Sequence, residues 1–439
     1  MESKNRKIAV PYAYLVDNIK VFLIFLVVFN HLIAFQLVKV SIGIRHIWYA
    51  ITIFHMPAFI FVSGYLSKKP QSVIKNIKSL LIPYILGYTL TWYSQIWIGK
   101  SMDYQLLRPS GTAMWYLLAL FIYRLTIEAL SKVRFIVPLS IIFALWAGLR
   151  PEFTTYLSTS RIVVFFPFFV AGYLWKSEYT KAIRKFKGKW IFPIVVFFLL
   201  FAVPNYMINH IIPVDIFRGN HSYLLSGVQN EIGMAIRLLM YLISFIVIFS
   251  LYAILPDRKL PTTYMGRKTM GIYFFHYPVM IVMNGLKILE LPQLLSVWSL
   301  LGMSVVFMLV LGNVLIDFLY NLVLKFLTAV IFKREKQIVD EGLEEEYDDD
   351  EEKYHIMIRR KKAIEDLAAT LQMEPIGQES DIADIPDMPN AETPPELELM
   401  ELPEMPEEDG LDWLPQRTEV LTENEDLPEW DIDENLEQK

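Results

Sequence analysis

The 439-residue chain contains no cysteine, which excludes disulfides, thiolate zinc sites, iron–sulfur clusters and a catalytic thiol. It also contains no G-x-x-x-x-G-K-[ST], G-x-G-x-x-G, G-x-S-x-G or H-E-x-x-H motif, so nucleotide hydrolysis, dinucleotide chemistry, a serine nucleophile elbow and a zincin site receive no support. Charged residues are scarce, at 20%, while apolar residues make up 54%. Soluble proteins carry about 25% charged residues, so this composition argues against a single soluble domain.

Acidic residues are almost absent from the first three quarters of the chain. Residues 1–332 hold 31 Lys and Arg against 11 Asp and Glu, a net charge of +20. Residues 333–439 hold 10 against 36, a net charge of −26. We therefore predict two parts, a polytopic membrane domain at 1–332 and an acidic, proline-containing tail at 333–439.

The first part is predicted to be an all-α integral membrane domain. A transmembrane helix needs about 20 apolar residues, and about ten stretches are candidates. The last of them is longer than a bilayer requires and is expected to tilt or to project past it. The stretches are 15–38, 47–66, 79–98, 113–130, 134–149, 161–175, 190–208, 234–255, 269–287 and 297–331.

Lys and Arg gather in alternate loops, at 68–78, 132–134, 176–189 and 258–268, whereas the loops between them hold only one or two each. The positive-inside rule then predicts that both termini are cytoplasmic. The longest outer loop, at 209–233, would either recognise something outside the membrane or simply be solvated. Its polar residues are His210, Asp215, Arg218, His221, Gln229 and Glu231.

The tail is expected to be largely disordered, because the block at 344–352 consists almost entirely of acidic residues. Residues 353–373 could form one amphipathic helix whose basic cluster contacts anionic lipid. Further on, acids, large apolar residues and prolines recur in clusters that resemble short linear binding motifs. The tail is thus either an inert solvated segment or a docking segment for a cytoplasmic protein. No nucleic-acid partner is expected.

Titratable residues inside a membrane are costly and therefore functional candidates. On the first span, His31 follows Lys20 by eleven residues, about three helical turns and roughly 16 Å. Both side chains then point to nearly the same face. This arrangement suits a ligand with its charged end at Lys20 and its reactive end at His31, where a neutral imidazole can accept a proton.

Two further histidines lie in predicted spans, each close to a proline. His55 is expected at a depth comparable to that of His31, beside a bend at Pro57. His276, in "IYFFHYP", is expected nearer the cytoplasmic side. Each histidine could instead be a packing residue with a hydrogen bond to a neighbour. A metal is not expected, because no acidic cluster accompanies the histidines.

The order of these segments resembles the membrane acyltransferase 3 family of bacterial O-acyltransferases, in particular its fucose 4-O-acetylase-like, exopolysaccharide-modifying branch. The resemblance covers about residues 14–330. Six segments carry it, namely "VDNIKVFLIFLVVFNH", "FHMPAFIFVSGYL", "KNIKSLLIPYILG", "MWYLLALFIYRL", "RIVVFFPFFVAGYL" and "MGRKTMGIYFFHYPV". The tail lies outside it.

The resemblance implies a multi-pass protein of the bacterial plasma membrane that uses cytoplasmic acyl-CoA, most simply acetyl-CoA, as its donor. The acceptor would be a hydroxyl of an extracytoplasmic cell-surface glycan or of its lipid-linked precursor. His31 matches the family's histidine and would be a general base on the acceptor hydroxyl or part of an acyl relay, with His55 as a second catalytic candidate. Donor-binding candidates are Lys20, which replaces the family's arginine, and Lys78. Candidates for substrate contact or structural support are Ser63, Trp115, Arg161, Tyr273 and His276.

Two other functions remain open on the sequence alone. Ten spans with intramembrane histidines and prolines also suit a transporter or flippase of a lipid-linked or acylated glycan, although no internal repeat is evident. A membrane scaffold that acts through its acidic tail is the third possibility, with the histidines as structural residues.

Overall fold

A computed structural model describes residues 11–101, 103–109, 112–153 and 155–332. Within these residues every regular element is a helix and no strand occurs, which confirms the all-α prediction. The acidic tail, including the amphipathic helix expected at 353–373, lies outside the described residues.

The helices of the domain differ widely in length. The principal ones are α1 (Pro11–Phe35), α2 (Ile42–Tyr65), α3 (Val73–Asn76), α4 (Ile82–Trp97), α5 (Trp115–Leu130), α6 (Ile136–Ala147), α7 (Thr159–Leu174), α8 (Ser177–Lys185), α9 (Ile191–Asn209), α10 (Asp215–Arg218), α11 (Asn230–Ile254), α12 (Thr263–Arg267), α13 (Thr269–Gly285), α14 (Val297–Leu311) and α15 (Val314–Ile331). A π-helical turn, Ile77–Leu81, joins α3 to α4.

Six helices in the described residues are long and apolar enough to cross a membrane, which agrees with an integral membrane protein. Other expected spans coincide with helices of 12 to 17 residues, such as α6 and α13. The number of ten spans stays a prediction. The six are Tyr14–Phe35, Ile42–Tyr65, Tyr156–Leu174, Ile191–Asn209, Asn230–Ile254 and Val314–Ile331.

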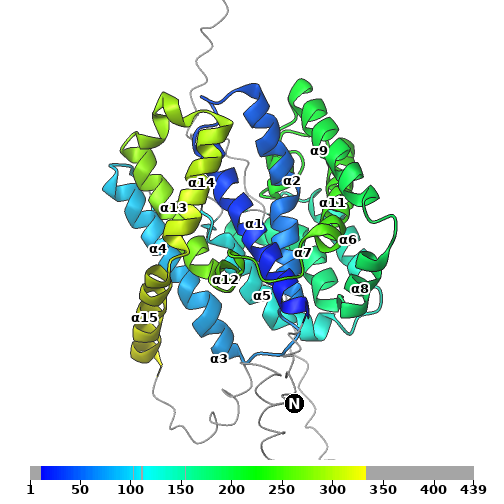
Figure 1. The fold of residues 1–439 in the computed structure, drawn as a ribbon, viewed down its shortest axis with the longest axis horizontal. Helices are drawn as coiled ribbons and strands as arrows, with labels where there is room; N and C mark the ends of the chain where they lie inside the picture. The colour runs from blue at the N-terminus through cyan, green and yellow to red at the C-terminus, as the bar shows by residue number, and fades with distance from the viewer. Residues whose placement is uncertain (1–10, 102, 110–111, 154, 333–439) are drawn as a thin grey trace, which may run out of the picture. The chain divides into compact units, whose positions relative to one another are not determined.

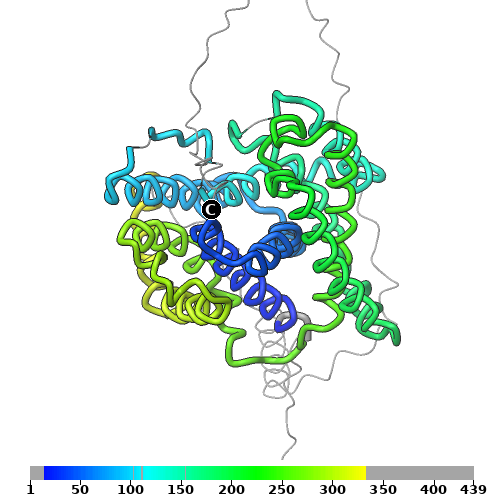
Figure 2. Tube along the Cα trace, turned by 90° about the horizontal axis from the view of Figure 1, so that it is seen from above, coloured from blue at the N-terminus to red at the C-terminus, as the bar shows by residue number. Residues whose placement is uncertain are grey.

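Helix α1 lies in the middle of the domain. Figure 1 and Figure 2 show α4, α13 and α14 on one side of it and α6, α7, α9 and α11 on the other. Its apolar side chains are buried along most of its length, from Leu15 to Ile33. Both groups of helices therefore meet at α1, which carries two of the predicted site residues.

Helices α2 and α7 cross at two glycines. A Cβ atom on Gly64 would lie 2.1 Å from the carbonyl oxygen of Phe169, and one on Gly172 would lie 1.9 Å from that of Phe61. Only hydrogen fits in either place, so the two backbones touch directly. Close backbone approach at small residues is a common way for membrane helices to associate, because lipid provides little hydrophobic drive between them.

Pro57 lies inside α2, two residues after His55. Proline has no N–H, so the carbonyl four residues earlier, that of Ile53, loses its helical partner. The hydroxyl of Ser244 on α11 donates to this carbonyl at 3.1 Å. The predicted release of a carbonyl near His55 therefore occurs, and a neighbouring helix satisfies it.

The long last span predicted at 297–331 is not one helix. Helix α14 ends at Leu311, and α15 begins at Val314 after Gly312 and Asn313. The side chain of Asn313 accepts a hydrogen bond from the backbone N–H of Leu315 at 2.9 Å. Asn313 is thus the N-cap of a new helix. The capping bond could not be recognised in a stretch that is otherwise mostly apolar.

The loop at 209–233, for which an outer location stays a prediction, is partly packed against the helices. Ile216, Phe217 and Tyr223 are fully buried, and Asp215 pairs with Arg218 at 3.0 Å within α10. The apolar residues between the polar ones therefore anchor this loop to α2 and α11.

Candidate active site

One continuous helix carries Lys20 and His31. Helix α1 runs without interruption through both residues, so they are separated by roughly 16 Å along its axis and by roughly 20° around it. The structure therefore supports the expected alignment of a cation near one end of α1 with an imidazole near the other.

The ring of His31 meets α13 rather than α2. Its centroid lies 5.3 Å from that of His276 and 5.2 Å from that of Tyr277. His276 lies beside His31 because α12 and α13 pack along α1. That His276 is nearer the cytoplasmic side stays a prediction. Within the described residues the ring of His31 contacts His276 and Tyr277 but not His55.

The tautomers of His276 and His55 follow from their hydrogen bonds. Nδ1 of His276 lies 2.7 Å from the carbonyl oxygen of Tyr273, and Nδ1 of His55 lies 2.7 Å from that of Ile51. A carbonyl only accepts, so in each neutral ring Nδ1 carries the proton and Nε2 keeps its lone pair. Nε2 of His276 is buried, and no hydrogen-bond partner for it lies within the described residues.

His31 differs from the other two histidines. It is partly exposed, whereas His55 and His276 are buried. Its contacts in the described part of the chain are ring contacts, and no hydrogen bond fixes its nitrogens there. Of the three imidazoles, His31 is therefore the best placed to receive a hydrogen bond from a substrate.

A row of polar aromatic residues leads from α2 to the histidines. Ser63 donates to the carbonyl of Phe59 at 2.8 Å, so the Tyr116 hydroxyl, 2.6 Å from Ser63 Oγ, is the donor of that bond. The Tyr116 ring lies 5.3 Å from that of Tyr273, which in turn lies 5.8 Å from that of His276. Ser63 and Tyr273 thus belong to one connected cluster with the histidine pair.

Two arginines border the cluster. The buried guanidinium of Arg161 lies 4.7 Å from the ring centre of Trp115, and its Nε donates to the carbonyl of Arg218 at 3.3 Å. Arg218 lies over Trp48 at 5.1 Å. The ring of Trp115 also lies 6.5 Å from that of Tyr116. Through Trp115 a buried guanidinium therefore borders the aromatic row that leads to the histidines.

Lys20 and Lys78 are not brought together by any described contact. Lys20 Nζ pairs with Asp17 at 2.9 Å, and its side chain is largely buried. Lys78 lies on the π-helical turn, exposed, with Nζ 5.0 Å from the ring centre of Phe332.

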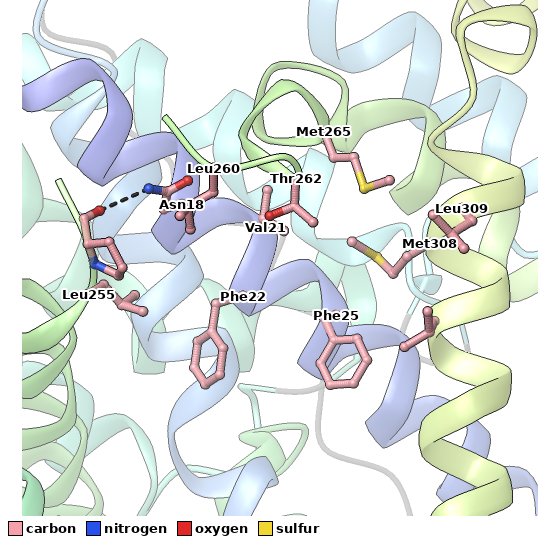
Figure 3. Close-up of a pocket in the computed structure, with 12 residues that line it drawn as sticks. Asn18, Val21, Phe22, Phe25, Leu255, Leu260, Thr262, Met265, Met308 and Leu309 are labelled. Atoms are coloured by element: carbon pink, nitrogen blue, oxygen red, sulfur yellow. Dashed lines mark hydrogen bonds between the residues drawn. The ribbon is translucent and has the colours of Figure 1, made fainter. Parts of the chain in front are cut away.

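A groove of about 310 Å³ follows α1, but on another face (Figure 3). Phe22 and Phe25, which line it, come two and five residues after Lys20, so they point roughly 200° and 140° away around the helix. The opposite wall includes Met308 and Leu309 of α14. This apolar groove is therefore separate from the histidine cluster.

Sequence reasoning missed Tyr116 and Arg267 as site candidates. Tyr116 directly follows the predicted Trp115, and Arg267 is the third residue of the segment "MGRKTMGIYFFHYPV". Both therefore stood inside quoted segments without a signal of their own. In the described residues no group of three or more His, Asp or Glu side chains could hold a metal ion.

Comparison with known proteins gives one family. The pattern described as an acyltransferase domain, of the acyltransferase 3 type, matches residues 14–313, which is more than half of the chain. The match includes α1 to α14 and ends before α15. No curated protein and no solved structure is significantly similar to the chain.

Proposed function

The chain belongs to the acyltransferase 3 family, and on that premise we propose that it transfers an acyl group, most simply acetyl, from cytoplasmic acyl-CoA to a hydroxyl of a cell-surface glycan or of its lipid-linked precursor. That it is a membrane acyltransferase follows from the family and from its apolar helices. The donor, the acceptor and the bacterial plasma membrane as its location are the proposal.

The observation that carries the proposal is the contact between His31 and His276. His31 shares helix α1 with Lys20. A base for the acceptor must have a free lone pair and access to the substrate. His31 is partly exposed and has no described hydrogen bond to fix it, while His276 Nε2 is a buried acceptor beside it. We assign His31 as the base and His276 as the residue that positions it.

The reaction balances with these groups. The acceptor hydroxyl gives its proton to His31, and its oxygen attacks the thioester carbonyl. The C–S bond breaks, and the CoA thiolate takes the proton from His31, which returns to the neutral form. Arg161, which borders the cluster through Trp115 and Tyr116, is the candidate to stabilise the oxygen that becomes negative in the transition state. Trp115 holds Arg161 by a cation–π contact.

Purified protein in nanodiscs with radiolabelled acetyl-CoA and crude cell-envelope glycan tests the proposal. We expect release of CoA together with label in the glycan. His31→Ala should bind acetyl-CoA and lower transfer by about 10²-fold or more. His210→Ala is the matched control, because His210 is exposed and stacked on Tyr206 away from the cluster, and it should retain full activity.

A wild-type protein that neither binds nor turns over any of a panel of acyl-CoAs would overturn the donor assignment. Substrate movement without donor turnover would support a flippase. Function that survives His31→Ala but is lost on removal of residues 340–439 would support a scaffold.

A further inference from the structure

The carboxylate of Asp17 on α1 pairs with two cations, Lys20 and Arg267. Asp17 Oδ1 lies 2.9 Å from Lys20 Nζ, and Asp17 Oδ2 lies 3.3 Å from Nε of Arg267. The group therefore carries a net charge of +1. The Asp17 side chain is only 10% exposed, whereas that of Arg267 is 70% exposed. Most of the Arg267 guanidinium thus faces solvent next to a nearly buried ion pair.

The backbone around Arg267 is held firmly against α1. Asn18 donates to the carbonyls of Pro256 and Arg258 at 2.9 and 3.0 Å, and the hydroxyl of Thr263 donates to Asn18 Oδ1 at 2.7 Å (Figure 3 shows the first of these bonds). A Cβ atom on Gly266 would lie 2.5 Å from the carbonyl oxygen of Asp17. Helix α12 can approach this closely only because residue 266 is glycine. The backbone at Arg267 is consequently held next to Asp17 before any ligand arrives.

We propose that Lys20 and Arg267 together form the phosphate-binding site for the CoA donor, with Arg267 supplying the guanidinium fork that Lys20 lacks. This inference rests on the proposed function. Lysine binds phosphate as a point charge, whereas arginine presents parallel N–H donors that match two phosphate oxygens. Asp17 uses Nε of Arg267, so the outer edge of the fork faces away from the carboxylate.

The position of the two cations agrees with this role. Lys20 points the same way around α1 as His31, so the phosphates would bind on the side of the helix that carries the candidate base. Asp17 compensates part of the positive charge when no donor is bound. A phosphate then gains a net positive site without having to assemble it.

Arg267 has two alternative roles that the experiment must separate from binding of the donor phosphates. It could serve only to fasten α12 to α1 through Asp17. It could also bind the phosphate of an anionic lipid, since the positive-inside rule places this end of the domain at the cytoplasmic surface. A donor without phosphates distinguishes the first role, and a membrane without anionic lipid distinguishes the second.

The experiment measures KM in phosphatidylcholine nanodiscs for acetyl-CoA and for S-acetylpantetheine, which carries no phosphate. For Arg267→Gln we expect KM for acetyl-CoA to rise about tenfold or more, because hydrogen bonds to charged groups are worth about 1.5–3 kcal/mol. KM for S-acetylpantetheine should stay unchanged. Arg267→Lys retains the charge and should show a smaller rise. Arg258→Gln, which removes a charge from the same loop, should leave both KM values as in the wild type.

Equal losses with both donors would overturn the inference in favour of a fastening role. An unchanged KM for acetyl-CoA would also overturn it. If Arg267→Gln lowers activity only after phosphatidylglycerol is added to the nanodiscs, the site binds a lipid headgroup and the inference is wrong. In all these cases the wild type still uses acetyl-CoA, whereas failure of the proposed function would show as no donor turnover by the wild type.

Discussion

The imidazole rings of His31 and His276 lie with their centroids 5.3 Å apart, although they come from opposite ends of the membrane domain's sequence. His276 Nδ1 bonds to its own helix, so its buried Nε2 is the acceptor that remains for a neighbour. We expect an N–H of His31 to be the donor to this Nε2 atom. The other His31 nitrogen would then keep a lone pair for the acceptor hydroxyl.

Replacement of His276 tests this relationship. We expect His276→Gln to lower kcat by about 10- to 100-fold, less than loss of His31 itself, with little change in acetyl-CoA binding. Parallel measurement of kcat and donor affinity checks it. His55→Gln is the matched comparison, because His55 has the same Nδ1 bond to its own helix but no ring contact with His31 in the described residues. A larger loss for His55→Gln would assign the positioning role to His55.

The hydrogen bond between Tyr116 and Ser63 should contribute to stability. Tyr116→Phe removes the donor, and Ser63→Ala the acceptor, of a buried 2.6 Å bond. Each change should lower the free energy of unfolding by about 1 kcal/mol, and the double variant by less than the sum, because the two residues share one interaction. Thermal unfolding in detergent measures both effects. Tyr93→Phe serves as control, since Tyr93 is 60% exposed; strictly additive losses would contradict the coupling.

The close crossing of α2 and α7 predicts that alanine is tolerated less well at a crossing glycine than at a glycine in open space. Gly172→Ala places a methyl group 1.9 Å from the carbonyl oxygen of Phe61, so the helices must separate. We expect a loss of about 1–3 kcal/mol or more and a lower yield of folded protein. Gly302→Ala, on α14, meets nothing within 4 Å and should be neutral or slightly stabilising. Size-exclusion profiles and melting temperatures compare the two variants, and equal behaviour would contradict the close crossing.

The outer loop should make the protein sensitive to acid through His221. Burial lowers the pKa of this histidine, Asp215 opposes that effect and Arg161 adds to it. A depressed pKa in the folded state means that the unfolded chain binds the proton more readily. The stabilising contribution is therefore present above about pH 6.5 and is lost as the pH falls below that value.

We accordingly expect the melting temperature to fall between about pH 7.5 and 5.5, and the fall to be smaller in His221→Gln. His210→Gln, which changes an exposed histidine of the same loop, should keep the slope of the wild type. A His221→Gln protein that melts with the wild-type slope would exclude this loop as the source of the acid sensitivity.

The sequence was most informative about residues that lie on the same helix. The alignment of Lys20 with His31 depends only on helical periodicity, and α1 is continuous through both residues. The carbonyl released by Pro57 could likewise be expected from the missing N–H, although nothing in the sequence identified Ser244 as its partner. Local rules predict what a residue requires, but not which distant residue supplies it.

Most of the relationships that sequence reasoning missed join distant segments. His31 meets His276 rather than His55, and Arg267 reaches Asp17, because α12 and α13 lie beside α1. The contact of His276 with His31 could not be predicted, because it depends on the packing of α12 and α13 on α1. The division between α14 and α15 was missed because Asn313 looks like an isolated polar residue until its capping bond is seen.

Helix α1 and the segment from α12 to α13 make contact at two heights, Asp17 with Arg267 at one end and His31 with His276 near the other. These two contacts fix how α1 and the segment from α12 to α13 are aligned along their length. An inserted residue in α13 before His276 would turn the imidazole by about 100° and move it by about 1.5 Å, even if Arg267 kept its place. A change in the length of one segment alone would separate one of the two contacts. We therefore expect insertions and deletions that preserve activity to fall outside residues 17–31 and 267–276.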